Sequence, residues 1–470
     1  MSRMHSIGFG ARLGLAVVLA VAVTDACLAQ SANRQLTHNA NGWLRTVTPN
    51  GEIDSSNPFF QSLGSNGRSC ASCHRQAEGW TLSVNEVRRR FAASGGRDPL
   101  FRPVDGAVSP LADVSSLAAR RRAYAMLLTH AVIRIGLPMP VPAEFTLTAV
   151  DDPYGYASAS ELSLFRRPLP ATNLMWVTGV MWDGRETFAP FQPPMDAAIH
   201  HAVLDASLTA QARDAILGHE QAGSAPDDAT LARIVAFESH LVTAQDRDHG
   251  AGALYTDGAM AGARILQQQR FWVGINDSLG GDPAGAAFDA AAMRLFDDWR
   301  HITPRHRGDT QSAARAAISR GEQLFDSLPI DITGVAGLND TTGKAVIHGT
   351  CSTCHNAPNI GNHSVGAPLD IGTADAAQRT PDMPLYTLTN TSTGEVVQST
   401  DPGLAMLTGK WADIGKFKGP ILRGVGAHPP YFHNGMAATL HDVVDYYDSR
   451  FNIGMSGQQK DDLVAFLKAL

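Results

Sequence analysis

Cysteine is scarce in this sequence, and that scarcity argues against a fold held together by disulfides. Only five cysteines occur in 470 residues. Four of them fall in two short motifs, at residues 70–74 and 351–355. The fifth, Cys27, precedes the predicted start of the mature chain, so the mature chain is expected to have no disulfide and no spare thiol.

Long basic runs and long apolar runs are also missing. The formal net charge is −7 and no basic run suggests a nucleic-acid surface, so we expect no nucleic-acid partner. Beyond the N-terminal region, no apolar stretch approaches the ~18 residues that a membrane-spanning helix needs. The mature chain is therefore predicted to have no membrane span. With 44% hydrophobic residues, it has ample material for a core.

The N-terminal region has the pattern of a cleaved secretory signal peptide. Arg3 and Arg12 supply positive charge, and residues 13–23 form an apolar run too short to cross a bilayer. Small side chains before Gln30 predict a signal peptide of residues 1–29, so we expect the mature protein in the periplasm. A lipid anchor on Cys27 fits less well, because the segment ahead of it carries a charge.

Two C-x-x-C-H motifs dominate what is present. They are Cys70-Ala-Ser-Cys73-His74 and Cys351-Ser-Thr-Cys354-His355. The pattern is typical of c-type haem attachment, in which two thiols form thioethers and the adjacent His binds the iron. A redox cysteine pair does not need the His, and a zinc site would need both motifs to meet at one metal. The sequence therefore predicts two covalently bound haem c groups.

Helical periodicity is the main signal in the rest of the chain, and no sustained two-residue alternation appears. Helices are expected near residues 83–91, 115–137, 228–244, 283–299 and 310–325, and a closing helix is expected after a capping box at Ser456. We predict a mainly α fold with little strand, made of two cytochrome-c-like haem domains with long irregular loops. A polar, proline-containing segment at residues 301–308 separates a domain of residues 30–305 from one of residues 306–470.

Three motifs make the chain resemble the bacterial di-haem cytochrome c peroxidase family, which includes the di-haem oxidase MauG. They are the first haem motif with its lead from Asn57, the segment Met181-Trp-Asp-Gly-Arg-Glu186, and residues 422–447 around Pro430-Tyr-Phe-His433. The resemblance implies that hydrogen peroxide reacts at the first haem, the peroxidatic one, held by His74. Electrons would enter at the second haem, held by His355. The donor would be a small periplasmic redox protein, such as a mono-haem cytochrome c or a cupredoxin. A protein substrate could take its place.

The resemblance also implies catalytic residues. Trp182 would lie between the haems and relay oxidising equivalents, with Arg185 beside it in the same motif. Gln192 fits a family position ten residues after the Trp. The next family position, an acid, falls near His201 here, and an imidazole is able to move the protons of peroxide. The alternative is that Trp182 is a core residue and His201 an ordinary surface histidine.

Tyr447 is the predicted sixth ligand of the second haem, because it stands fourteen residues after His433, where MauG has Tyr. The residues Leu440, Val443, Val444 and Tyr447 share one face of a helix that begins after Thr439, and Tyr446 points away from that face. A phenolate ligand stabilises ferric iron. Tyr447 could instead be a hydrogen-bonded core aromatic.

Other expectations stay open. The family has a calcium between the haems, and His428 and Pro430 match two of its carbonyl ligands. Arg167 stands near the expected Asn, and a cation there disfavours calcium. The alternative functions are a di-haem oxygenase similar to rubber oxygenases and a non-enzymatic electron carrier. In a carrier, His130, Met126 or Met139 could be the sixth ligand of the first haem.

Overall fold

The fold is mainly helical, as predicted, with several small sheets. The computed structural model describes residues 35–188, 197–303, 306 and 308–470, of which 33% are helical and 16% are in strands or bridges. The predicted signal peptide lies outside these residues. Within them, no helix has both the length and the apolar character needed to cross a membrane.

The first half of the chain contains six helices and seven strands among its described residues. The helices are α2 (Val84–Ser94), α3 (Leu117–Ala123), α4 (Ala125–His130), α5 (Ala197–Gly218), α6 (Asp228–Ser239) and α7 (Ala263–Leu266). The strands are β1 (Leu36–Asn39), β2 (Gly42–Val47), β3 (Ile133–Leu137), β4 (Phe145–Asp151), β5 (Leu162–Arg166), β6 (Val242–Asp248) and β7 (Gly252–Ala253).

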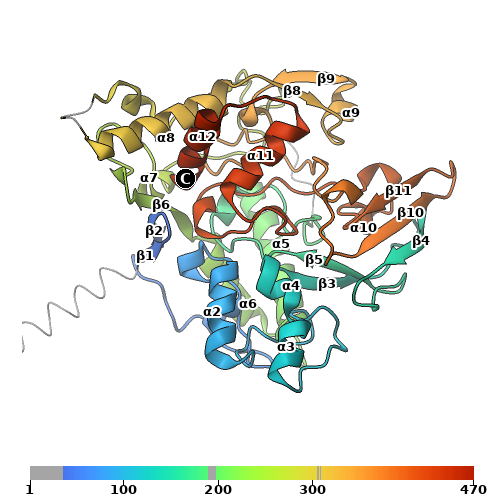
Figure 1. Cartoon of the computed structure of the whole chain (residues 1–470). Helices are drawn as coiled ribbons and strands as arrows, with labels where there is room; N and C mark the ends of the chain where they lie inside the picture. Colours follow the sequence, from blue (N-terminus) through green and yellow to red (C-terminus); the bar gives the residue numbers. More distant parts are fainter. Residues whose placement is uncertain (1–34, 189–196, 304–305, 307) are drawn as a thin grey trace, which may run out of the picture.

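The second half is built around three longer helices. These are α8 (Thr310–Ser327), α11 (Leu440–Arg450) and α12 (Gly457–Lys468), and they lie together at the top of Figure 1. Shorter elements complete this half: β8 (Ile330–Thr333), α9 (Asn339–Thr342), β9 (Val346–Gly349), β10 (Leu385–Asn390), β11 (Val396–Ser399) and α10 (Ala405–Thr408). The predicted cap at Thr439 and the predicted capping box at Ser456 are both confirmed, and the Ser456 hydroxyl accepts from the Gln459 N–H.

The crossing of α8 and α12 depends on a glycine. A Cβ atom added to Gly321 would lie 2.0 Å from the carbonyl oxygen of Asp462. Arg320 fixes the same crossing through an ion pair of 2.7 Å with the Asp462 carboxylate. The two helices therefore pack close enough to form one wall of the C-terminal core, together with Phe325 and Phe466.

One sheet joins the two halves of the chain. Its strand order is β11-β10-β4, and β4 pairs antiparallel with β10, from Leu385 opposite Asp151 to Asn390 opposite Phe145. This sheet lies at the right of Figure 1. The other sheets have the orders β1-β2-β6-β7, β3-β5 and β8-β9.

Three of the expected helices differ in the structure. The helix expected at residues 228–244 ends at Ser239, and strand β6 begins at Val242. Residues 115–137 form α3 and α4 and then strand β3, because the chain turns at Ala131 with a φ of 49° and β3 finds a partner strand in β5. Residues 283–299 are irregular until the short 3-10 helix Asp297–His301. Buried Trp299 and Phe296 anchor that segment to the core without a regular helix.

Candidate active site

Both C-x-x-C-H motifs adopt the same local structure. The first begins with a 3-10 turn, Cys70–Ser72, closed by a capping box between Ser69 and Ser72. The second begins with the turn Cys351–Thr353, closed in the same way by Thr350 and Thr353. In each motif the His main-chain N–H donates to the carbonyl of the first Cys, at 3.0 and 3.1 Å. The shared turn brings both thiols and the imidazole to one side of the chain.

Each motif histidine is held in one tautomer. Nδ1 of His74 donates to the Trp80 carbonyl at 3.0 Å, and Nδ1 of His355 donates to the Gly361 carbonyl at 2.6 Å. Burial lowers the pKa of both imidazoles and keeps them neutral. Because Nδ1 carries the proton, Nε2 carries the lone pair that a metal would bind.

The four motif cysteines are free thiols, and burial makes them poor thiolates. Burial raises the pKa of Cys351 and Cys354 to about 12 and raises that of Cys70 and Cys73 as well. A redox-active pair needs a lowered thiol pKa, so these surroundings argue against it. Within the described part of the chain, no three His, Cys, Asp or Glu side chains gather in a metal-binding group. The two motifs therefore do not meet at one zinc ion.

Each motif lines its own cavity. The first cavity holds the thiols of Cys70 and Cys73 with His74, and Arg185 of the predicted catalytic set lies in its wall. The second holds Cys351, Cys354 and His355. The predicted helix face completes the second cavity, since it is lined by Leu440, Val443, Val444 and Tyr447. Burial raises the pKa of the Tyr447 phenol.

Trp182 lies in a wall that the two cavities share. The residues lining both are Arg167, Pro168, Leu169, Pro170, Trp182, Lys418 and Ile421. The Trp182 ring makes an edge contact with His433, with ring centroids 6.3 Å apart. The indole is therefore placed where the predicted relay between the two sites would need it.

A buried ion network lies directly beside this wall. Asp183, fully buried, accepts from the guanidinium groups of Arg166 and Arg185, and Arg166 also pairs with Asp401 at 2.6 Å. Burial opposes ionisation of Asp183, but the two arginines hold its pKa at about 2. Arg185 is thus fixed at the edge of the first cavity by a carboxylate from its own motif.

One of the predicted catalytic residues lies away from the cavity, and another is outside the described residues. His201 is exposed on the first turns of α5 and does not line the first cavity. Its neighbour His200 is buried and bonds through Nε2 to the Val177 carbonyl at 3.0 Å. Gln192 lies outside the described residues. The geometry therefore gives the predicted proton-transfer role of His201 no support.

Two carboxyl groups that the sequence analysis did not single out line the first cavity. Glu220 follows α5, and its Oε1 lies 3.8 Å from the Cys70 sulfur. Glu238, on α6, is 5% exposed, and burial raises its pKa to about 8. Glu238 stands four residues after Ile234 on the buried face of the predicted helix, so helical spacing alone could have placed it inward.

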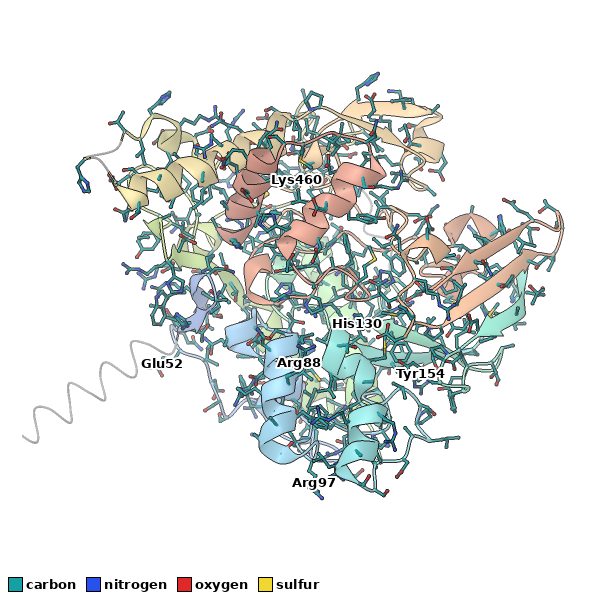
Figure 2. All side chains as sticks on the ribbon, in the orientation of Figure 1. Glu52, Arg88, Arg97, His130, Tyr154 and Lys460 are labelled. Atoms are coloured by element: carbon teal, nitrogen blue, oxygen red, sulfur yellow. The ribbon has the colours of Figure 1, made fainter. Side chains whose placement is uncertain are left out.

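The carbonyl of His428, proposed as a calcium ligand, and the side chain of His130, an alternative iron ligand, have other partners. The guanidinium of Arg167 donates from Nη2 to the carbonyls of His428 at 2.9 Å and Leu82 at 2.7 Å. His130, labelled in Figure 2 at the end of α4, bonds to Asp382 and to the Gly435 carbonyl. Neither His130 nor Met126 nor Met139 lines the first cavity.

Comparison with known proteins gives partial matches to cytochrome-c peroxidases. No family model matches the chain. The cytochrome-c peroxidase IdrP1 of Pseudomonas sp. (strain SCT) is 30% identical over 203 residues, which are 39% of this chain and 51% of the relative. IdrP2 of Denitromonas iodatirespirans is 36% identical over 149 residues, 27% of this chain and 37% of the relative. Over these regions the chain is similar to bacterial cytochrome-c peroxidases. The resemblance predicted from the motifs is thereby confirmed.

The matched regions span about half or less of these peroxidase relatives. The cytochrome c551 peroxidase of Nitrosomonas europaea, for example, is 31% identical over 121 residues, 26% of this chain and 30% of the relative. A solved MauG-like protein associated with microbial copper homeostasis is 16% identical over 88% of this chain and 87% of that chain, with a TM-score of 0.36. The diheme peroxidase BthA from Burkholderia thailandensis is 16% identical over 90% and 88%, with a TM-score of 0.31. Structural likeness at this level supports no conclusion about function.

Proposed function

We propose that the chain is a periplasmic di-haem c-type oxidoreductase that reduces hydrogen peroxide, or uses it to oxidise a substrate. One observation carries this proposal: each C-x-x-C-H motif lines a cavity of its own, and Trp182 lies in the wall between the two cavities. The sequence similarity to cytochrome-c peroxidases supports the same interpretation. Electrons would come from a small periplasmic cytochrome c or cupredoxin, or from a protein substrate.

The residues present fit two covalently held haems. Each motif offers two thiols outside any disulfide for thioethers and a neutral imidazole whose Nδ1 is held by a carbonyl, which directs Nε2 to a metal. The haems would supply the redox chemistry and the site at which peroxide is cleaved. The chain itself would hold them in two cavities that are mostly apolar, which limits access of water.

Proton supply is a task for the chain. Reduction of hydrogen peroxide to water consumes protons as well as electrons, so the first cavity needs a group that gives and takes protons. Glu238 fits, because burial holds its pKa at about 8 and keeps the carboxyl protonated near neutral pH. Glu220 lines the same cavity and is a second candidate. The predicted role of His201 stays a prediction.

The proposal is tested first by counting haems and then by adding peroxide. A pyridine haemochrome assay of the periplasmic protein should give two covalent haems per chain. The double variant C70S/C73S should give one. Peroxide added after one-electron reduction should change the absorption spectrum of the wild type and leave that of C70S/C73S unchanged.

Other results would favour the alternatives. Two low-spin haems that never respond to peroxide would overturn the peroxidase proposal and leave an electron carrier. A spectral response that needs dioxygen and occurs without peroxide would point to an oxygenase. Oxygen consumption, measured with an electrode in the presence of catalase, separates these two outcomes.

A further inference from the structure

The second cavity has an unusual charge pattern. Among the described residues that line it, there are two full cations, Arg167 and Lys418, and no Asp or Glu. Its cysteine end is apolar, with Phe325, Ile330 and Ile332 around the thiols. The cations lie in the wall that the two cavities share, so both charges face the first cavity as well.

Neither cation belongs to a salt bridge in the part of the chain that the structure describes. Arg167 is 5% exposed, its Nη2 donates to two carbonyls, and its Nη1 has no hydrogen-bond partner. Lys418 is half-buried, and this partial burial lowers the pKa of its amine to about 8, the direction expected for an amine without a carboxylate. The carbonyl of His428 accepts one of the Arg167 hydrogen bonds. Both ring nitrogens of His428 are also buried without hydrogen-bond partners.

Two arginines of the first cavity, unlike Arg167 and Lys418, have carboxylate partners. Arg68 pairs with Asp105, and Arg185 pairs with Asp183. A buried cation without an anionic partner is strongly unfavourable, so such a group normally marks a site where a ligand supplies the anion. The haem c proposed at each cysteine motif would supply such anions, because it carries two propionates on the edge away from its thioethers.

We propose that Arg167 and Lys418 form a shared anion-binding wall that pairs with haem propionates from both cavities and so sets the redox potentials of both sites together. The proposal rests on the haem occupancy proposed above. A positive charge close to an iron favours its reduced state, because reduction lowers the net positive charge. One pair of side chains would then tune two redox centres at once.

The test is a spectroelectrochemical titration of the holoprotein. Arg167→Gln and Lys418→Gln should each shift the midpoint potentials of both haems to more negative values. Arg167→Lys keeps the charge and should restore much of the potential. Lys344→Gln removes an exposed positive charge from a residue that lines neither cavity, and it should leave both potentials where they are in the wild type.

The outcomes separate this proposal from the function on which it rests. Suppose that Arg167→Gln and Lys418→Gln each bind two haems and keep the wild-type midpoint potentials. That result would overturn the shared wall and leave the peroxidase proposal intact. A shift confined to one haem would also overturn it. Should Arg167→Gln fail to load haem, Lys418→Gln decides: a negative shift of both potentials supports the shared wall, and no shift overturns it.

Discussion

The indole N–H of Trp182 donates a hydrogen bond to the main-chain carbonyl of Arg167, with 2.8 Å between nitrogen and oxygen. The main-chain N–H of Arg167 donates in turn to the carbonyl of His433 at 2.6 Å. The carbonyl of Trp182 accepts from the main-chain N–H of Lys418 at 2.9 Å. These three bonds hold the indole between residues of both halves of the chain, in the wall between the cavities.

Replacing Trp182 with Phe should slow electron transfer between the two sites. Phe keeps the aromatic packing but loses the N–H donor and is harder to oxidise than indole. We expect peroxide turnover to fall at least about tenfold, which corresponds to about 1.4 kcal/mol in the barrier, with two haems still bound. The matched control is Trp411→Phe, since Trp411 packs on Phe145 away from both cavities. Equal turnover in the two variants would contradict the relay role.

Tyr447→Phe should alter the low-spin spectrum of the second haem. Burial raises the pKa of the Tyr447 phenol, so only a strong cation such as ferric iron would remove its proton. Tyr446 is a close control, because its hydroxyl donates to the Ile371 carbonyl at 2.5 Å and it does not line the cavity. Tyr446→Phe should leave the spectrum unchanged. If neither variant changes the spectrum, Tyr447 is a core aromatic and not a ligand.

Asp183→Asn should destabilise the protein by about 3 kcal/mol, because it leaves buried arginines with one carboxylate fewer. The pKa of Asp183 is held at about 2, so its contribution is present above the unfolded value near 4 and is lost only as pH falls towards 2. Urea unfolding at pH 7 measures the loss. Asp331→Asn, which breaks an exposed pair with His348, should cost about 0.5 kcal/mol or less. Similar losses in the two variants would contradict the role of the buried network.

The pair His130–Asp382 should make stability depend on pH. Burial opposes protonation of His130, but its hydrogen bond to Asp382 raises the pKa above the usual value, and the same bond lowers the pKa of Asp382 to about 2. The histidine contribution is complete below about pH 6.5 and is lost as pH rises through the folded pKa. The aspartate contribution is complete above about pH 4 and is lost as pH falls towards 2.

The window of full stabilisation is therefore about pH 4 to 6.5. Because Asp382 is partly exposed, the effect should stay below about 1 kcal/mol after solvent screening. The difference in unfolding midpoint between the wild type and Asp382→Asn should shrink as pH is raised from 6 to 9. A constant difference across that range would show that the pair does not titrate as described.

Calcium removal should leave peroxide turnover unchanged. The guanidinium of Arg167 donates to the His428 carbonyl, which is one of the carbonyls that a calcium ion would need. Dialysis against a calcium chelator, followed by a turnover assay with and without added calcium, measures this directly. Loss of turnover that calcium restores would mean that a calcium site exists in spite of the buried cation.

The 3.6-residue helical period predicts which residues of the helices face the site. Leu440, Val443, Val444 and Tyr447 were placed on one face by the 3.6-residue period, and all four line the second cavity. The same rule explains the position of His201. His200, Leu204 and Leu208 are buried on one face of α5, and His201 points about 100° away from it.

Other features depend on partners that are far away along the chain. Strand β3 alternates apolar and other residues over only five positions, and its partner β5 begins at Leu162. That run is too short to outweigh the helical pattern before it. Arg167 is buried because the carbonyls of Leu82 and His428 accept from it. No local sequence pattern around residue 167 predicts either hydrogen bond.

The sheet that joins β4 to β10 limits how such a protein can be rearranged in evolution. A recombination between relatives near residue 305 would pair a β4 strand from one relative with a β10 strand from another. The sequences of these two edges would not have evolved together. The same exchange would separate Arg166 from the Asp401 with which it is buried. The two halves are thus expected to be inherited as one unit, although each carries a C-x-x-C-H motif of its own.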